Sequence, residues 1–197
     1  MHLEGEKKSG IPPEKMFPGQ SLLAQAARIK ALIELTHSEE VLDYGSGKGL
    51  QYMPMGINIG GKKSDYKSIP EFWHIKKLVC YDPGYQPFST LPVREFDGVI
   101  CTDVLEHCPE EDIDWVVNEL FRFAKKFVFG NIARYPADKF LPNGENAHCT
   151  IKPIEWWRGI IEETASQYPT ICYEFYIADM EIIGGKKKYA ESIVKNN

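Results

Sequence analysis

Apolar and polar residues follow two different periods along this chain, which predicts a mixture of helices and strands. Three segments place apolar residues at helical spacing, and they are 20–36, 110–124 and 153–168. Four short, nearly continuous apolar runs are typical of buried strands, and they are 40–44, 75–81, 96–102 and 126–132. Because helices and strands alternate, we expect an α/β fold in which a parallel sheet carries helices on both faces.

The end of the chain breaks this alternation. Two strand-like segments, 171–178 and 189–194, are joined by a loop that holds Gly184-Gly185 and no helix. Parallel neighbours need a long crossover connection, usually a helix, whereas antiparallel neighbours need only a short loop. We therefore expect an antiparallel hairpin at one edge of the sheet.

Two stretches stand outside the pattern. Residues 1–18 are polar and carry three prolines, so we expect an arm or lid, with Met16-Phe17 folding over the site. Residues 51–75 are interrupted by glycines and a proline, and we expect them to form an insertion near the site. Residues 19–197, insertion included, are expected to form a single domain.

The strongest chemical signal is a run of alternating glycines directly after the first predicted strand, Asp43-x-Gly45-x-Gly47-x-Gly49. In sheets of this kind, ligands bind at the carboxyl ends of the strands. Glycines there let the backbone approach a ligand closely and adopt positive φ angles. A dinucleotide site requires Gly-x-Gly-x-x-Gly and a P-loop requires Gly-x-x-x-x-Gly-Lys-Ser/Thr, so neither fits this spacing.

The segment 41–49 resembles the first motif of class I S-adenosylmethionine-dependent methyltransferases. The resemblance implies a Rossmann-like, doubly wound sheet of the seven-stranded type with an antiparallel last strand. It also implies that Asp43 holds the amino-acid end of the cofactor, often through water. The loop residues expected beside the cofactor are Gly45, Ser46, Gly47 and Gly49. The alternative is a tight glycine turn after a buried strand, without a ligand.

An acidic residue also ends the second predicted strand, where Asp82 precedes Pro83. A carboxylate at that place accepts hydrogen bonds from ribose hydroxyls in other nucleotide-binding α/β folds. The resemblance gives Asp82 this role and places Pro83 beside the cofactor. The alternative is ordinary turn chemistry, because Asp before Pro is common at strand ends.

The spacing around Asp82 departs from the family pattern. Asp82 lies 39 positions after Asp43, where a simple βαβ unit places the acid about 20 residues on. Only 14 residues separate Asp82 from Asp97, too few for a helix and a strand. We therefore expect the third strand of the sheet to be short or missing, and we assign no residue to the adenine.

The segment 96–107 closely resembles the fourth-strand motif of small-molecule methyltransferases of the quinone-biosynthesis type. That resemblance places Asp103 at the end of the strand, facing the methionine amino group or the substrate, with Val104 and Leu105 lining the pocket. The Asp/Asn-Pro-Pro-Tyr/Phe motif of amino-directed DNA methyltransferases is absent from this place. Cys108-Pro109 reverses the Pro-Cys order of the cytosine-carbon enzymes.

His148 lies in a polar segment between the strand 126–132 and the helix that Pro153 opens, which crosses the substrate side in this fold. A histidine accepts a proton near neutral pH, so we expect His148 to be a general base or to orient the substrate. The alternative is a histidine that braces its loop. His107, Cys108, His148 and Cys149 lack zinc-ligand spacing, and we assign no metal, although their convergence in space is an open alternative.

Composition limits the partners. The chain is 43% hydrophobic and 26% charged with a net charge of -5, which is typical of a globular protein and favours neither nucleic acid nor an anionic membrane. No apolar run approaches the roughly 20 residues of a membrane span, and the N-terminus does not resemble a secretory signal. Five cysteines, an odd number, fit free thiols in a reducing cytoplasm. The sequence does not indicate the oligomeric state.

We therefore expect a soluble, cytoplasmic S-adenosylmethionine-dependent methyltransferase that acts on a small molecule through an O, N or C atom. Two alternatives stay open. One is a transferase that uses the same cofactor differently, and the other is a non-enzymatic binding or scaffold module on the same fold. Product formation distinguishes an enzyme from the binding or scaffold module, which would hold the cofactor without turning it over.

Overall fold

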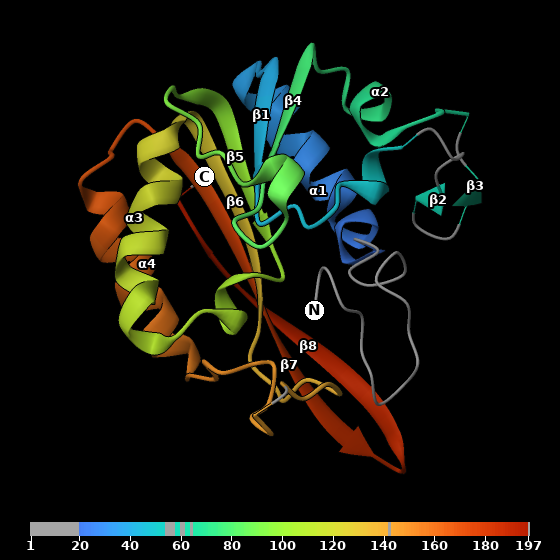
Figure 1. Ribbon diagram of the computed structural model, residues 1–197, viewed down its shortest axis with the longest axis vertical. Helices are drawn as coiled ribbons and strands as arrows, with labels where there is room; N and C mark the ends of the chain where they lie inside the picture. The colour runs from blue at the N-terminus through green and yellow to red at the C-terminus, as the bar shows by residue number, and fades with distance from the viewer. Residues whose placement is uncertain (1–19, 54–57, 60–61, 64, 142, 197) are drawn as a thin grey trace. The chain divides into compact units, whose positions relative to one another are not determined.

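The structure is a computed structural model that describes residues 20–53, 58–59, 62–63, 65–141 and 143–196. The chain divides into two compact units on either side of the bond between Arg94 and Glu95. Figure 1 shows the elements of both units, which are described in turn. The predicted arm or lid at 1–18, with Met16-Phe17, lies outside the described residues, and the expectation of a single domain stays a prediction.

The first unit pairs two parallel strands and covers them with a helix. Strand β1 (Glu40–Tyr44) and strand β4 (Lys77–Tyr81) run parallel and in register, with Asp43 opposite Cys80. Helix α1 (Gln20–Thr36) has the predicted bounds. Its apolar stripe is buried, and the stripe consists of Leu22, Ala26, Ile29 and Ile33. The 3-10 turn η2 (Leu50–Tyr52) follows the glycine loop.

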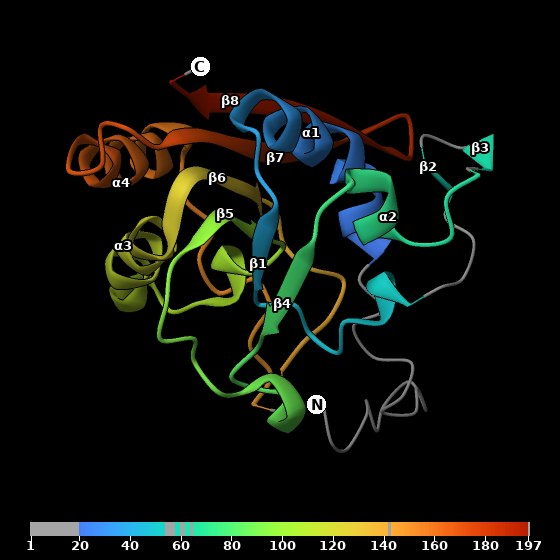
Figure 2. The same ribbon diagram turned by 90° about the horizontal axis from the view of Figure 1, so that it is seen from above.

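The segment 51–75, predicted to be an insertion, contributes in part to the core of this unit. It contains the short antiparallel pair β2 (Asn58–Ile59) and β3 (Lys62–Lys63), followed by helix α2 (Ile69–Trp73). Trp73 is buried, and its indole Nε1 donates a hydrogen bond of 2.8 Å to the carbonyl of Ala26. This bond joins α2 to α1, and both views show the two helices side by side (Figure 2).

The third strand was predicted to be short or missing, and the chain that follows β4 bears on this prediction. Residues 82–95, all of which are described, contain the 3-10 turn η3 (Gln86–Phe88) and no strand. Apart from the small β2-β3 pair, the described residues hold two strands in the first unit and four in the second. The structure therefore establishes the α/β class, and it does not contain the seven strands of the expected fold among the described residues.

The second unit contains four strands in the order β5-β6-β7-β8. Strands β5 (Phe96–Thr102), β6 (Ala124–Ala133) and β7 (Cys172–Ile183) are parallel, and β8 (Lys186–Lys195) runs antiparallel to β7. Gly184 and Gly185 turn the hairpin with φ angles of 60° and 75°, values that favour glycine. The expected antiparallel last pair is thus confirmed, and both of its strands are longer than predicted.

Two helices cover one side of the second unit. Helix α3 (Ile113–Phe123) and helix α4 (Ile154–Ser166) lie side by side in both ribbon views. The buried face of α3 consists of Ile113, Val116, Val117, Leu120 and Phe121. Trp157 of α4 is buried whereas Trp156 is half-buried, as expected for neighbours on a helix.

Close packing in this sheet depends on two glycines within the strands. A Cβ atom on Gly98 of β5 would lie 2.0 Å from the ring of Phe127, and one on Gly130 of β6 would lie 2.4 Å from the ring of Phe175. Both aromatic rings therefore occupy space that any other residue at those two positions would fill.

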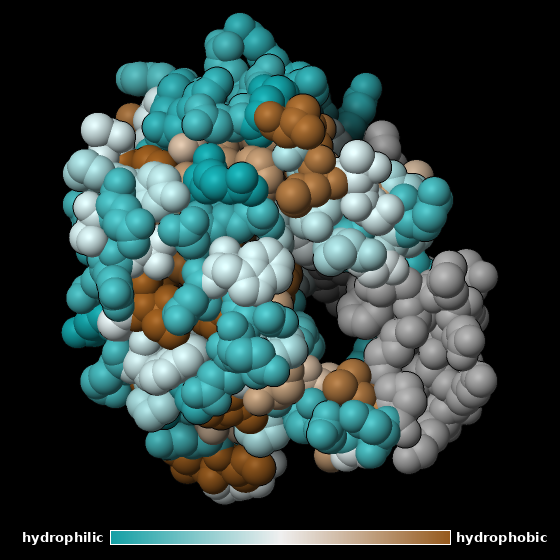
Figure 3. All heavy atoms as spheres, turned by 60° about the vertical axis from the view of Figure 1, so that its left-hand side comes forward, coloured by the Kyte–Doolittle hydropathy of each residue, from teal (hydrophilic) through white to brown (hydrophobic). Residues whose placement is uncertain are grey.

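Figure 3 shows a mostly hydrophilic face on which hydrophobic residues gather in several small groups. All five cysteines are free. Within the described part of the chain, every helix is too short or too polar to cross a membrane.

Candidate functional site

The glycine loop of the first unit turns sharply after β1. Gly45, Gly47 and Gly49 have φ angles of 84°, 57° and 65°. The backbone N–H groups of Gly45 and Ser46 both donate to the carbonyl of Tyr81, at 2.8 and 3.1 Å. The loop therefore passes over the carboxyl ends of both β1 and β4, as the predicted ligand site requires. A Cβ atom on Gly49 would also approach the Phe88 ring to 3.0 Å.

Asp82 holds the glycine loop against the end of β4. Its carboxylate accepts the N–H of Gly47 on Oδ2 and the N–H of Gly84 on Oδ1, both at 2.8 Å. The second bond closes an Asx turn around the exposed Pro83, which is the turn chemistry left open by the sequence. A carboxylate offers about four acceptor positions, so two N–H contacts are compatible with further donors.

Asp43 is almost completely buried, with 1% of its surface exposed. Its Oδ2 accepts a 2.7 Å bond from the Tyr52 hydroxyl and a 3.4 Å bond from Nε2 of Gln51. Burial raises the pKa of Asp43 to about 7, against the opposing effect of these two donors, and Asp82 adds to the rise. Tyr52 and Gln51 could not be predicted as partners of Asp43, because nothing in their spacing along the chain points to it.

Three side-chain oxygens in or beside this loop are buried without a hydrogen-bond partner among the described residues. They are the hydroxyl oxygen of Ser46 and two pure acceptors, Oδ1 of Asp43 and Oε1 of Gln51. A buried polar atom without a partner costs about 1–3 kcal/mol, so such atoms are rare and require an explanation. The two pure acceptors can each accept hydrogen bonds, so the site has the chemistry to hold a group that donates several of them.

Asp103 directly follows β5 in the second unit and has strained backbone geometry. Its φ angle is 53°, in the left-handed region that residues with a side chain seldom adopt. The Asn131 amide donates to Oδ1 of Asp103, and the N–H of Asp103 donates to the carbonyl of Asn131 at 3.3 Å. Val104 follows as a half-buried residue, and Leu105 is completely buried. Asn131, a lone amide within an apolar strand, is the signal that the sequence analysis missed.

Glu106 follows in the 3-10 turn η4 (Leu105–His107) and is completely buried, with 0% of its surface exposed. Oε1 accepts a 3.1 Å bond from the N–H of Ala133, whereas Oε2 has no hydrogen-bond partner among the described residues. Burial, and then the nearby charge of Asp103, raise the pKa of Glu106 to about 8. The Glu106 carbonyl accepts the N–H of Thr150 at 3.1 Å, which joins the loop of His148 to this turn.

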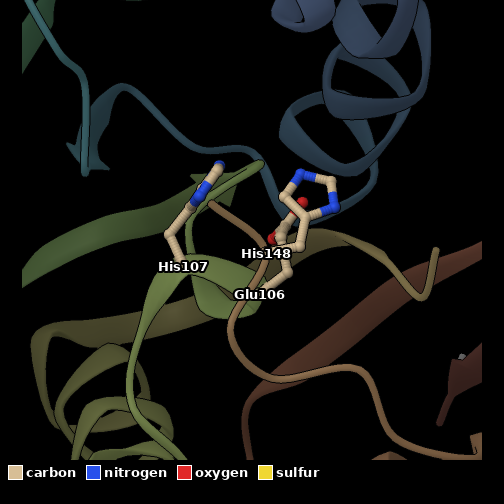
Figure 4. A group of neighbouring side chains, drawn as sticks. All are labelled: Glu106, His107 and His148. Atoms are coloured by element: carbon tan, nitrogen blue, oxygen red, sulfur yellow. The ribbon is translucent and has the colours of Figure 1, made fainter. Parts of the chain in front are cut away.

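His107 and His148 meet directly above Glu106 (Figure 4). Their ring centroids are 4.8 Å apart, with the planes inclined by 74°. Nδ1 of His107 lies 2.7 Å from the carbonyl of Ala147, and Nδ1 of His148 lies 2.6 Å from the carbonyl of Tyr135. A carbonyl only accepts hydrogen bonds, so each Nδ1 carries a proton, and Nε2 is the nitrogen of each ring that can hold a lone pair.

The contacts of His148 show that it braces its loop, and its role as a general base or substrate-orienting residue stays a prediction. Its Nδ1 braces the loop through Tyr135, and its N–H donates to Oδ1 of Asn146 at 2.9 Å. Its Nε2 is oriented as an acceptor, which a general base requires. For His107, burial lowers the pKa from its usual value, which also favours a neutral ring.

The two cysteines considered with these histidines make other contacts. The thiol of Cys149 donates to the carbonyl of Cys108 at 3.1 Å, and the thiol of Cys108 lies 3.5 Å from the carbonyl of Val104. The histidines do converge, but a carboxylate rather than a thiol is the third member of their group.

Comparison with models of known protein families and with curated proteins finds no match for this chain.

Proposed function

We propose that the chain is a cytoplasmic S-adenosylmethionine-dependent methyltransferase with a small-molecule acceptor, built on the Rossmann-like, seven-stranded-type fold. The unpartnered acceptors Oδ1 of Asp43 and Oε1 of Gln51 at the glycine loop carry this proposal. The methionine end of the cofactor presents an ammonium group with three N–H donors and a positive charge. Such a group supplies the missing hydrogen bonds and favours the ionised form of Asp43.

The rest of the loop fits the other parts of the same ligand. The three glycines at alternate positions have positive φ angles and no side chains, so a ligand can approach the backbone of the segment 45–49. The Asp82 carboxylate, fixed by Gly47 and Gly84, would accept the ribose hydroxyls. Pro83 and Ser46 would lie against the cofactor as the family resemblance implies.

Methyl transfer makes few chemical demands on the protein. When bound, S-adenosylmethionine supplies a sulfonium whose methyl carbon is electrophilic. Under this proposal Nε2 of His148 accepts the proton that an O–H or N–H acceptor loses as its lone pair forms the new bond to carbon. The cofactor would also supply the leaving group, because its sulfur would keep the electrons of the carbon–sulfur bond. Asp103 and Val104 would position the methionine end or the acceptor.

One observation favours a second candidate, a binding or scaffold module that does not catalyse transfer. Residues 82–95 hold only the turn η3 where family members have a strand and a helix. A cofactor pocket on this fold would therefore have fewer residues available to contact the adenine. A module of this kind would bind the cofactor but would not release S-adenosylhomocysteine, nor would it act as another type of transferase.

Calorimetry with S-adenosylmethionine tests the proposal. We compare the wild type with Asp43→Asn, which keeps the shape and removes the charge, and with Asp65→Asn, which changes an exposed carboxyl of the same unit. We expect binding by the wild type, unchanged binding by Asp65→Asn, and a loss of about tenfold or more for Asp43→Asn.

Absence of binding by a folded wild type would refute the cofactor assignment, and equal affinities for the three proteins would refute the role of Asp43. Release of S-adenosylhomocysteine is then measured with a panel of small acceptors. Binding without release across that panel would favour the binding module over the enzyme.

A further inference from the structure

Glu106, His107 and His148 bring three potential metal ligands together. One carboxylate oxygen and one ring nitrogen from each histidine all lie within 4.8 Å of one another. Figure 4 shows the three side chains gathered where the turn η4 meets the loop that carries His148. Ligands of one ion at about 2.1 Å stand roughly 3 to 3.5 Å apart, so small side-chain rotations would complete the geometry.

The hydrogen bonds around the histidines prepare both rings for a metal. Each Nδ1 proton is directed to a carbonyl, that of Ala147 for His107 and that of Tyr135 for His148. Metal-bound histidines usually make this outer bond, because it fixes the tautomer and the orientation of the ring. The lone pair on each Nε2 is the donor that a metal requires.

The buried carboxylate is an independent sign of a missing cation. Glu106 is completely buried, and Oε2 has no partner in the described part of the chain. A charged group in such surroundings is costly unless a cation or hydrogen-bond donors compensate it.

We propose that Glu106, His107 and His148 bind one divalent transition-metal ion of the zinc, manganese or iron class. Two imidazoles and one carboxylate favour such ions over Mg²⁺ and Ca²⁺, which prefer oxygen ligands. Three protein ligands leave coordination positions open, and the exposure of His107 makes them accessible from solvent. This site goes beyond the proposed methyl transfer. A metal on Nε2 of His148 would take the lone pair that a general base needs, so a metal-loaded chain could not use His148 as the base.

Metal binding to the untagged, chelator-stripped chain tests the proposal without any cofactor present. Calorimetry with Zn²⁺ and Mn²⁺, and the visible spectrum of the Co²⁺ form, report affinity and ligand type. We expect one Zn²⁺ per chain and binding of Mg²⁺ that is far weaker. Glu106→Gln and His148→Gln should each weaken Zn²⁺ binding by about 10- to 100-fold or more.

Cys149→Ser is the matched control, because this exposed thiol adjoins His148 but lies outside the proposed ligand set. It should bind Zn²⁺ like the wild type. Equal affinity of His148→Gln and wild type, or a loss confined to Cys149→Ser, would overturn the site. If Glu106→Gln fails to fold, His148→Gln decides alone, because its side chain is only half-buried in a loop.

Discussion

The buried carboxyl of Asp43 makes a quantitative prediction about stability. Its pKa is raised from 3.8 to about 7, chiefly because burial disfavours the charged form. The unfolded chain ionises this carboxyl near pH 4, whereas the folded chain keeps the proton until pH is near 7. The free energy of unfolding therefore falls as pH rises between these two values and then levels off.

The size of the effect follows from the shift. One pKa unit corresponds to about 1.4 kcal/mol, so the full cost of ionising Asp43 in the folded chain is about 4 kcal/mol. Between about pH 5 and pH 8 the cost grows by about 2 to 3 kcal/mol. Asp43→Asn removes this titration, so its stability relative to the wild type should increase by that amount over the same interval.

Urea denaturation followed by tryptophan fluorescence at several pH values measures this difference. Asp65→Asn serves as the control, because it makes the same chemical change at an exposed carboxyl of the same unit. A gap between Asp43→Asn and wild type that is constant, or that shrinks as pH rises, would refute the reasoning. It would mean that Asp43 is already ionised and compensated in the folded chain.

Two further predictions concern the second unit. Gly98→Ala should lower the free energy of unfolding by about 1–3 kcal/mol or more, because its Cβ would lie 2.0 Å from the Phe127 ring. Urea denaturation should show this loss and its partial recovery when Phe127→Leu is added. Gly159→Ala is the control and should show no loss, because a Cβ there would meet no neighbouring atom within 4 Å. His148→Gln should slow methyl transfer by about 10²–10⁴-fold with little change in S-adenosylmethionine affinity, because a base acts on the acceptor. Steady-state kinetics measures the rate and calorimetry measures the affinity. A parallel loss of affinity would contradict the assignment of His148 as the base.

Local patterns predicted most of the secondary structure because the period of apolar residues depends on short stretches of chain. Helix α1 and strand β5 have the predicted bounds. The last hairpin does not, since β7 and β8 extend through residues whose side chains are largely exposed. Strand β7 pairs with β6 as far as Ala178, and its later residues pair only with β8 in the described part of the chain. Hydrogen bonding between β7 and β8 maintains these additional residues as strands, and no period of apolar residues predicts them.

The glycine loop was predictable for the same local reason. Its spacing and its position after a strand pointed to a turn with positive φ angles, and Asp82 was identified by its place at the end of the next strand. The partners of these residues were not predictable. Tyr52 and Gln51 reach Asp43 because the turn η2 folds back over the loop, a path that residue spacing does not reveal.

The amino-acid sequence by itself determined the α/β class, the order of the main elements, the antiparallel end and the glycine turn. Each of these depends on residues that are neighbours in the chain. Only the tertiary structure decided that Asp43 and Glu106 keep unpartnered oxygens, and that His107 and His148 meet across 41 positions. Burial and convergence arise when distant segments pack together, and they decide which ionisable groups acquire unusual chemistry.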